Sequence, residues 1–178
     1  MDATATPAAP KESANRHNDV PTQGAADLRR AFGCLPSGVA AVCADIEPHP
    51  TGMLVSSLTS VSLEPPLLSF CVQNGSRTWA GLQTATHVGV SFLGDTHEQV
   101  CVQFGGESSQ RLARIPVRRT AEGAVLLEDA AATFVCSLYE EFSAGDHTIV
   151  VLRIETFEAA PECAPLVFHR SRYRTLAG

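Results

Sequence analysis

Lysine is almost absent from this sequence: Lys11 is the only lysine among 178 residues. One lysine near the N-terminus effectively excludes two enzyme classes, those that form a Schiff base with their substrate and those that hold a nucleotide with a P-loop lysine. Cations are outnumbered by anions, since 13 Lys and Arg face 19 Asp and Glu, which gives a net charge of −6. That charge argues against nucleic acid as a partner, because binding it needs a field of cations.

Several short motifs are also missing. The six cysteines contain no C-x-x-C pair, which argues against zinc ribbons and thioredoxin-like sites, and we expect them to be buried as small apolar side chains. Without a G-x-G-x-x-G, a doubly wound dinucleotide-binding domain is not expected. G-x-S-x-G and H-E-x-x-H are missing too, so the sequence predicts no metal site and none of the standard hydrolases.

Long hydrophobic runs are lacking as well. No apolar stretch approaches the roughly 20 residues that a membrane helix needs, and 44% hydrophobic with 18% charged residues is typical of soluble globular proteins. The first residues show neither the basic nor the apolar region of a secretory signal. We therefore predict a disordered tail over 1–26, a single domain over 27–178, and a cytoplasmic location.

The patterns that are present predict mainly strands. Apolar or alternating stretches predict strands over 38–46, 67–73 and 87–93, a hairpin of two long strands over 133–142 and 147–157, and a last short strand over 165–174. On that last strand Arg170, Arg172 and Arg174 would share one face.

Helices are expected to be few and short. They are predicted over 28–35, from a Ser76 N-cap onward, and over 96–104 with a capping box formed by Asp95 and Glu98, while 108–122 is predicted to be an irregular loop. Antiparallel strands with so few helices favour a mainly β fold, a closed or split barrel, over a parallel sheet with crossover helices.

Two segments carry the chemistry. The run PTGMLVSSLTSVSLEPP (50–66) is rich in glycine and small hydroxyl residues, which allow main chain to approach a flat apolar ring with a polar edge. The segment QNGSRTW (73–79) combines hydroxyls, a guanidinium and free amides at a helix start, which suits a phosphate. Taken singly, these serines are typical of turns; together they indicate a flavin site.

With these segments the sequence resembles the short-chain flavin reductase family, the reductase components of two-component flavin-dependent monooxygenases. The resemblance runs from 28 to 176 through LRRAFGCLPSGVAAV, GMLVSSLTSVSLEPPLLSF, NGSRTWAGL, HVGVSFL, QFGG, AGDHTIVV and PLVFHRSRYRTL. It implies a split-barrel FMN-binding fold with a few short helices, a homodimer, FMN or FAD as flavin, and NADH or NADPH as reductant.

The resemblance also implies the residues of the site. Flavin contacts are expected at Pro50, Thr51, Gly52, Met53, Leu54, Ser56, Ser57, Cys71, Val72 and Gln73. The flavin phosphate is expected at Ser76, Arg77 and Thr78, with Gln103 and Phe104 close by. The nicotinamide nucleotide is expected to meet His147, Phe168, His169, Arg170 and Tyr173, with His147 as the positioning residue.

Three functions from different classes remain open on the sequence. The first is a reductase that transfers hydride from nicotinamide C4 to flavin N5 and supplies reduced flavin to a partner monooxygenase, a reaction in which the protein needs no acid, base or nucleophile of its own. The alternative is a flavoprotein that holds FMN tightly and acts on its own small-molecule substrate. A third is a non-catalytic flavin-binding module.

Overall fold

The computed structural model describes residues 24–176, so most of the predicted tail lies outside the described residues. The strands are β1 (Ser37–Gly38), β2 (Ala40–Ala44), β3 (Thr51–Val55), β4 (Thr59–Leu63), β5 (Pro66–Gln73), β6 (Val88–Phe92), β7 (Val117–Arg119), β8 (Val125–Leu127), β9 (Ala132–Ala144), β10 (His147–Ala159), β11 (Leu166–His169) and β12 (Arg172–Thr175). The helices are α1 (Ala25–Phe32), α2 (Arg77–Leu82), α3 (Glu98–Phe104) and the 3₁₀ turns η1 (Asp95–His97) and η2 (Ser108–Gln110).

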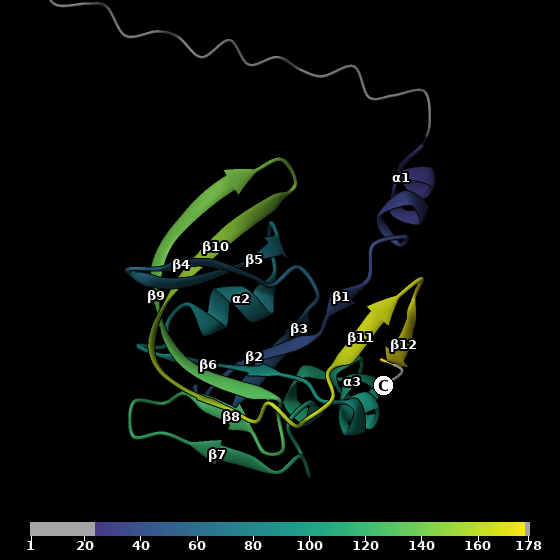
Figure 1. Cartoon of the computed structure of the whole chain (residues 1–178). Coiled ribbons are helices and arrows are strands. Elements are labelled where there is room, and N and C mark those ends of the chain that lie inside the picture. Colours follow the sequence, from purple (N-terminus) through teal and green to yellow (C-terminus); the bar gives the residue numbers. More distant parts are fainter. Residues whose placement is uncertain (1–23, 177–178) are drawn as a thin grey trace, which may run out of the picture.

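Seven strands form one antiparallel sheet in the order β3-β2-β6-β9-β10-β5-β4. Figure 1 shows the long strands β9 and β10 curving around α2, and their ladder carries two register shifts, near Val151 and near Ile154. Such bulges bend a sheet locally. Within residues 24–176 no ladder joins β3 to β4, so the barrel is split, which confirms the predicted mainly β class.

Strand β2 is buried on both faces. All five of its residues, Ala40 to Ala44, are inaccessible. Val42 packs with Phe70, Trp79 and Leu82 in one core, while Cys43 on the opposite face packs with α3 and β8 in a second core. A continuous apolar run of small side chains is what a doubly covered strand requires.

Helix α2 fills the concave side of the sheet (Figure 1). Its predicted cap is confirmed, since Ser76 Oγ accepts a 3.2 Å bond from the Trp79 amide. The Trp79 ring meets Phe70 edge to face at 5.3 Å, and its Nε1 donates to Glu141 Oε1 at 2.6 Å. Trp79 is therefore a core residue.

The C-terminal segment differs from the prediction of one strand. It is a hairpin, β11 and β12, turned by Arg170 and Ser171, whose φ values are 51° and 59°. The turn separates Arg170 from Arg172 and Arg174, so the predicted common face of the three arginines is wrong. Positive φ at two consecutive non-glycine residues is uncommon, and the residue types at these two positions did not predict a turn. The turn is tied to α1, because the Arg170 amide donates to the Gly33 carbonyl at 3.2 Å.

Three other elements differ in detail. Helix α1 starts at Ala25 after a Gly24 N-cap and ends at Phe32, so both of its ends lie earlier than predicted. Around Asp95 the chain forms the 3₁₀ turn η1 instead of a capping box with Glu98, because the buried His97 accepts from the Gly94 amide through Nδ1 and faces the Glu128 carbonyl through Nε2. The predicted loop 108–122 contains η2 and β7.

Gly89 on β6 provides a test of this packing. A Cβ there would overlap the Val125 carbonyl, with its carbon only 2.6 Å away, whereas a Cβ on Gly38 meets nothing within 4 Å. Because main chain cannot yield as a side chain does, we expect Gly89→Ala to lower the free energy of unfolding by about 1–3 kcal/mol. Gly38→Ala should stay within about 0.5 kcal/mol of the wild type. Urea denaturation compares the two, and equal stabilities would contradict the packing described here.

Candidate functional site

Three adjoining hollows lie along β3, the end strand of the large sheet. We name them the large, middle and small hollows, with volumes of about 610, 390 and 130 Å³. Thr78 and Arg111 line both the large and the middle hollow, and Leu54 and Tyr173 line both the middle and the small one. The hollows therefore form one continuous groove.

The middle hollow combines apolar walls with a few polar groups. Met53, Leu54 and Phe104 give apolar surface, while Ser76, Thr78 and Arg111 bring hydroxyls and a guanidinium to one end. This composition suits a ligand with a flat apolar ring and an anionic tail.

Many of the sequence-predicted residues meet at this groove. Those that line it are Pro50, Thr51, Met53, Leu54, Ser56, Ser76, Arg77, Thr78, Phe104, Phe168 and Tyr173. Those that line none of the three hollows are Gly52, Ser57, Cys71, Val72, Gln73, Gln103, His147, His169 and Arg170.

Arg111 is the residue that sequence reasoning missed. Its Nη1 donates to the Gly52 carbonyl and to Thr78 Oγ1, both at 3.1 Å. Its Nε is buried without a hydrogen-bond partner. Buried guanidinium groups are usually satisfied, so the unpaired Nε makes Arg111, which lines both the large and the middle hollow, a candidate contact for an anionic ligand. The only sequence signal was a polar loop with an arginine in it, too common to single out Arg111.

Gln103 holds the loop that carries Arg111. Its side-chain amide donates to the carbonyls of Gln110 and Arg111 at 3.1 Å each, and also to that of Ala113. The amide is thus turned toward the loop, and Gln103 acts on the groove through the position of Arg111.

Gly52 serves the sheet more than the groove. A Cβ at this position would collide with Cys43 Sγ on the neighbouring strand and lie 3.1 Å from the Val42 carbonyl. The missing side chain therefore lets β3 pack on β2, while the Gly52 carbonyl faces the groove and accepts from Arg111.

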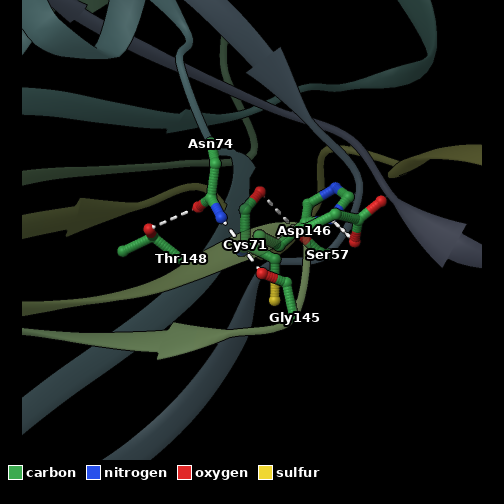
Figure 2. A network of polar contacts seen from close by, with 7 residues as sticks. Ser57, Cys71, Asn74, Gly145, Asp146 and Thr148 are labelled. Atoms are coloured by element: carbon green, nitrogen blue, oxygen red, sulfur yellow. Dashed lines mark hydrogen bonds and ion pairs between the residues drawn. The ribbon is translucent and has the colours of Figure 1, made fainter. Parts of the chain in front are cut away.

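The hydroxyl of Ser57 is already engaged. It accepts a 2.9 Å bond from the Cys71 amide and lies 3.3 Å from the Cys71 carbonyl, as Figure 2 shows. Ser57 thus ties the segment after β3 to β5, and beside it the Val72 side chain is buried in the core. A flavin contact at Cys71 or Val72 stays a prediction.

His147 lies at the start of β10, directly after Asp146, which Figure 2 labels. Its Nδ1 is 2.8 Å from Asp146 Oδ1, and its partner across the ladder on β5 is Gln73. The hydrogen bond to His147 and then its charge lower the pKa of Asp146. Asp146 therefore stays ionised and orients the imidazole.

Asn74 fixes the same hairpin end. Its Nδ2 donates to the Gly145 carbonyl at 3.1 Å, and its Oδ1 accepts from Thr148 Oγ1 at 2.9 Å (Figure 2). Two predicted site residues, Gln73 and His147, are thus held opposite each other in the ladder.

Tyr173 lines the groove where the middle hollow meets the small one. Its ring packs on Phe168 with centroids 5.5 Å apart. Burial, and then the neighbouring Cys101, raise the pKa of Tyr173 to about 12. The phenol is therefore neutral at physiological pH and presents a ring and a hydroxyl to the groove.

A split barrel whose end strand borders a groove of apolar, hydroxyl and guanidinium side chains defines a flavin-binding class of protein. The model of the Flavin reductase like domain matches residues 32–177. The chain belongs to this flavin reductase family.

Two curated relatives illustrate the family. The reductase subunit Stc3 of stachydrine N-demethylase from Rhizobium meliloti (strain 1021) is 34% identical over 75% of this chain and 58% of its own length. The reductase subunit HsaB of a flavin-dependent monooxygenase from Rhodococcus jostii (strain RHA1) is 29% identical over 82% of this chain and 75% of its own. The chain thus spans less than two thirds of Stc3.

A solved structure shares the fold. The NADH:FAD oxidoreductase SgcE6 of Streptomyces globisporus C-1027, in complex with NAD and FAD fragments, has a TM-score of 0.80 and 31% identity, covering 85% of this chain and 92% of its own. The fold and family predicted from the sequence are confirmed.

Two further findings concern residues 24–176. No helix there is long and apolar enough to cross a membrane. No group of three or more His, Cys, Asp or Glu side chains gathers there in a way that could hold a metal ion.

The cysteines differ from the expectation that all are buried. Cys43, Cys101 and Cys136 are buried, Cys163 is half-buried, and Cys34 and Cys71 are exposed. Cys34 lies just after the end of α1, and Cys71 lies on the outward side of β5. The apolar pattern of the sequence did not distinguish these positions from core positions.

Thiol reactivity tests this arrangement. Burial raises the pKa of Cys43, Cys101 and Cys136, the last to about 12, so few of these thiols ionise near pH 8. We expect Cys34 and Cys71 to react rapidly with a disulfide reagent in native protein, and the three buried cysteines only after unfolding. Cys71→Ser should remove one fast-reacting thiol. Rapid reaction of the Cys101 thiol in native protein would contradict the closed wall of the middle hollow.

Proposed function

We propose that this protein is an NAD(P)H-dependent flavin reductase that supplies reduced FMN or FAD to a partner monooxygenase. The observation that carries the proposal is the groove along β3, where Arg111, whose Nε is buried without a partner, lines the middle hollow together with Ser76 and Thr78. Membership of the flavin reductase family supports the same reaction class.

The groove has features that suit a flavin, independently of the family match. Strand β3 ends the sheet, so one of its edges has no neighbouring strand within residues 24–176. The Gly52 carbonyl points out from this edge, and by strand alternation the amide and carbonyl of Leu54 face the same way. These backbone groups suit the polar edge of an isoalloxazine, and the apolar walls suit its faces.

The polar end of the groove fits the phosphate. Ser76, Thr78 and Arg111 would hold it, with Arg77 beyond them. A guanidinium and two hydroxyls supply charge-assisted and neutral hydrogen bonds to a phosphate dianion.

Hydride transfer from the reduced nicotinamide is the chemistry that a bound flavin supplies. The chain itself has to bind both rings, orient them face to face and exclude water. Tyr173 and Phe168 close one end of the groove, and His147, oriented by Asp146, stands at the hairpin end where the resemblance puts the nicotinamide.

A second copy and an oxygenase complete the proposed assembly. Large apolar side chains on β4 and β10 are exposed, Leu63 by 94% and Phe157 by 69%, which supports a homodimer. The relatives Stc3 and HsaB carry names of reductase subunits, which supports a monooxygenase-type partner. Either NADH or NADPH serves as the reductant in this proposal, and the cytoplasmic location stays a prediction.

An oxidation assay tests the function. We expect purified protein to oxidise NADH or NADPH, followed at 340 nm, only when FMN or FAD is added. Desalted protein should be colourless, because a reductase with a diffusible flavin releases it. A yellow protein after desalting would favour the tightly bound flavoprotein, and flavin binding without any turnover would favour the non-catalytic module; either result contradicts the proposal.

Arg111 is the residue to substitute. Because a hydrogen bond to a charged group contributes about 1.5–3 kcal/mol, we expect Arg111→Gln to raise the flavin Kd by roughly 10- to 100-fold in a calorimetric titration. Arg111→Lys should recover part of the loss. Arg118→Gln, which breaks only the exposed pair with Glu158, is the matched control and should leave the Kd unchanged. A wild-type Kd in Arg111→Gln would remove Arg111 from the site.

A further inference from the structure

The groove extends beyond the part assigned to the flavin ring and first phosphate. The proposed function puts the ring and first phosphate in the middle and small hollows, of about 390 and 130 Å³, and the groove continues past Thr78 and Arg111 into a further 610 Å³. This space is bounded by the segment before β3, by one face of α2 and by η2. Its lining residues include Ile46, Pro48, His49, Arg77, Gly81 and Ser109.

The guanidinium groups of Arg111 and Arg77 follow one another along the groove. Arg111 lies at the junction and lines both hollows, whereas Arg77 lines only the large one. A single phosphate needs the junction alone. A cation at the junction followed by a second one beyond it suits a pyrophosphate.

Beyond the arginines the surface changes to one that fits a neutral heterocycle. Ile46, Pro48 and His49 give flat apolar and aromatic surface to one wall. Two carboxylates, Glu47 and Glu107, also line this hollow. They disfavour a third phosphate there and can accept hydrogen bonds from ribose hydroxyls or an exocyclic amine.

We propose that the large hollow binds the adenosine monophosphate half of FAD, so that this reductase selects FAD over FMN. This inference rests on the proposed function and specifies which flavin it uses. The second phosphate meets Arg77, and the adenine lies against the segment before β3.

Isothermal titration calorimetry of the full chain with FMN and with FAD tests the inference. We expect the FAD Kd to be at least about tenfold lower than the FMN Kd, since the second phosphate and the adenine add contacts. Equal affinities, or tighter FMN, would overturn it. Failure of the proposed function is a separate result: no NADH or NADPH oxidation with either flavin, whatever their relative affinities.

Variants that fill the large hollow give a second measurement. Ser109 is exposed on η2, and Gly81 faces it from α2 with only the Ile46 side chain within 4 Å of a Cβ. Ser109→Trp and Gly81→Leu should each raise the FAD Kd about tenfold or more and change the FMN Kd less than twofold. Gln99→Trp, also at an exposed position but outside the groove, should change neither.

Two outcomes of these variants contradict the assignment. If both filling variants weaken FMN as much as FAD, the large hollow belongs to the flavin ring site. If they raise the KM for NADH with FMN as acceptor and leave the FAD Kd unaltered, the hollow binds the nicotinamide nucleotide instead.

Discussion

The close packing around β2 is the constraint on which the rest of the structure depends. Cys43 pairs with Gly52 of β3 on one side and with Gly89 of β6 on the other. A Cβ on Gly52 would strike Cys43, and one on Gly89 would strike the main chain at Val125. This row of small residues lets β8 lie directly on the sheet, so that one strand separates two cores. The Cys43 thiol and the main chain at Val125 leave no room for a side chain at Gly52 or Gly89. The positions of β3 and β6 are therefore fixed.

That packing places the groove. With β3 fixed at the end of the sheet, its free edge faces α2 and the chain after α3, and the hollows follow that edge. The amide of Gln103 gathers the carbonyls of the following loop, and the loop delivers Arg111 to the Gly52 carbonyl and Thr78. The free edge of β3 thus offers main-chain hydrogen-bonding groups to the groove, and Arg111 adds a cation. Such an arrangement suits the flat anionic cofactor of the proposed function, for which the chain needs no reacting group of its own.

The β9–β10 hairpin positions two predicted site residues, Gln73 and His147, that line none of the three hollows. Asn74 bonds to both sides of the hairpin turn, and the ladder sets Gln73 opposite His147. The C-terminal hairpin closes the groove from a third direction through Tyr173 and Phe168. Residues more than a hundred positions apart in the chain, such as Leu54 and Tyr173, therefore line one groove.

Local patterns in the sequence determined most of the elements. Alternating and buried strands, the Ser76 cap and the core position of Trp79 follow from periodicity and hydrogen-bonding chemistry within a few residues. The hydroxyl-rich run and the Ser76 to Thr78 segment predicted a flavin site because their residue types are informative in themselves. Only the tertiary structure placed Arg111 in the site, turned Gln103 toward the loop, engaged Ser57 with Cys71 and made a hairpin of the last strand. Each of these depends on a partner that is distant in sequence or on a turn with no local signal, and a single sequence records residue types but not which distant groups meet.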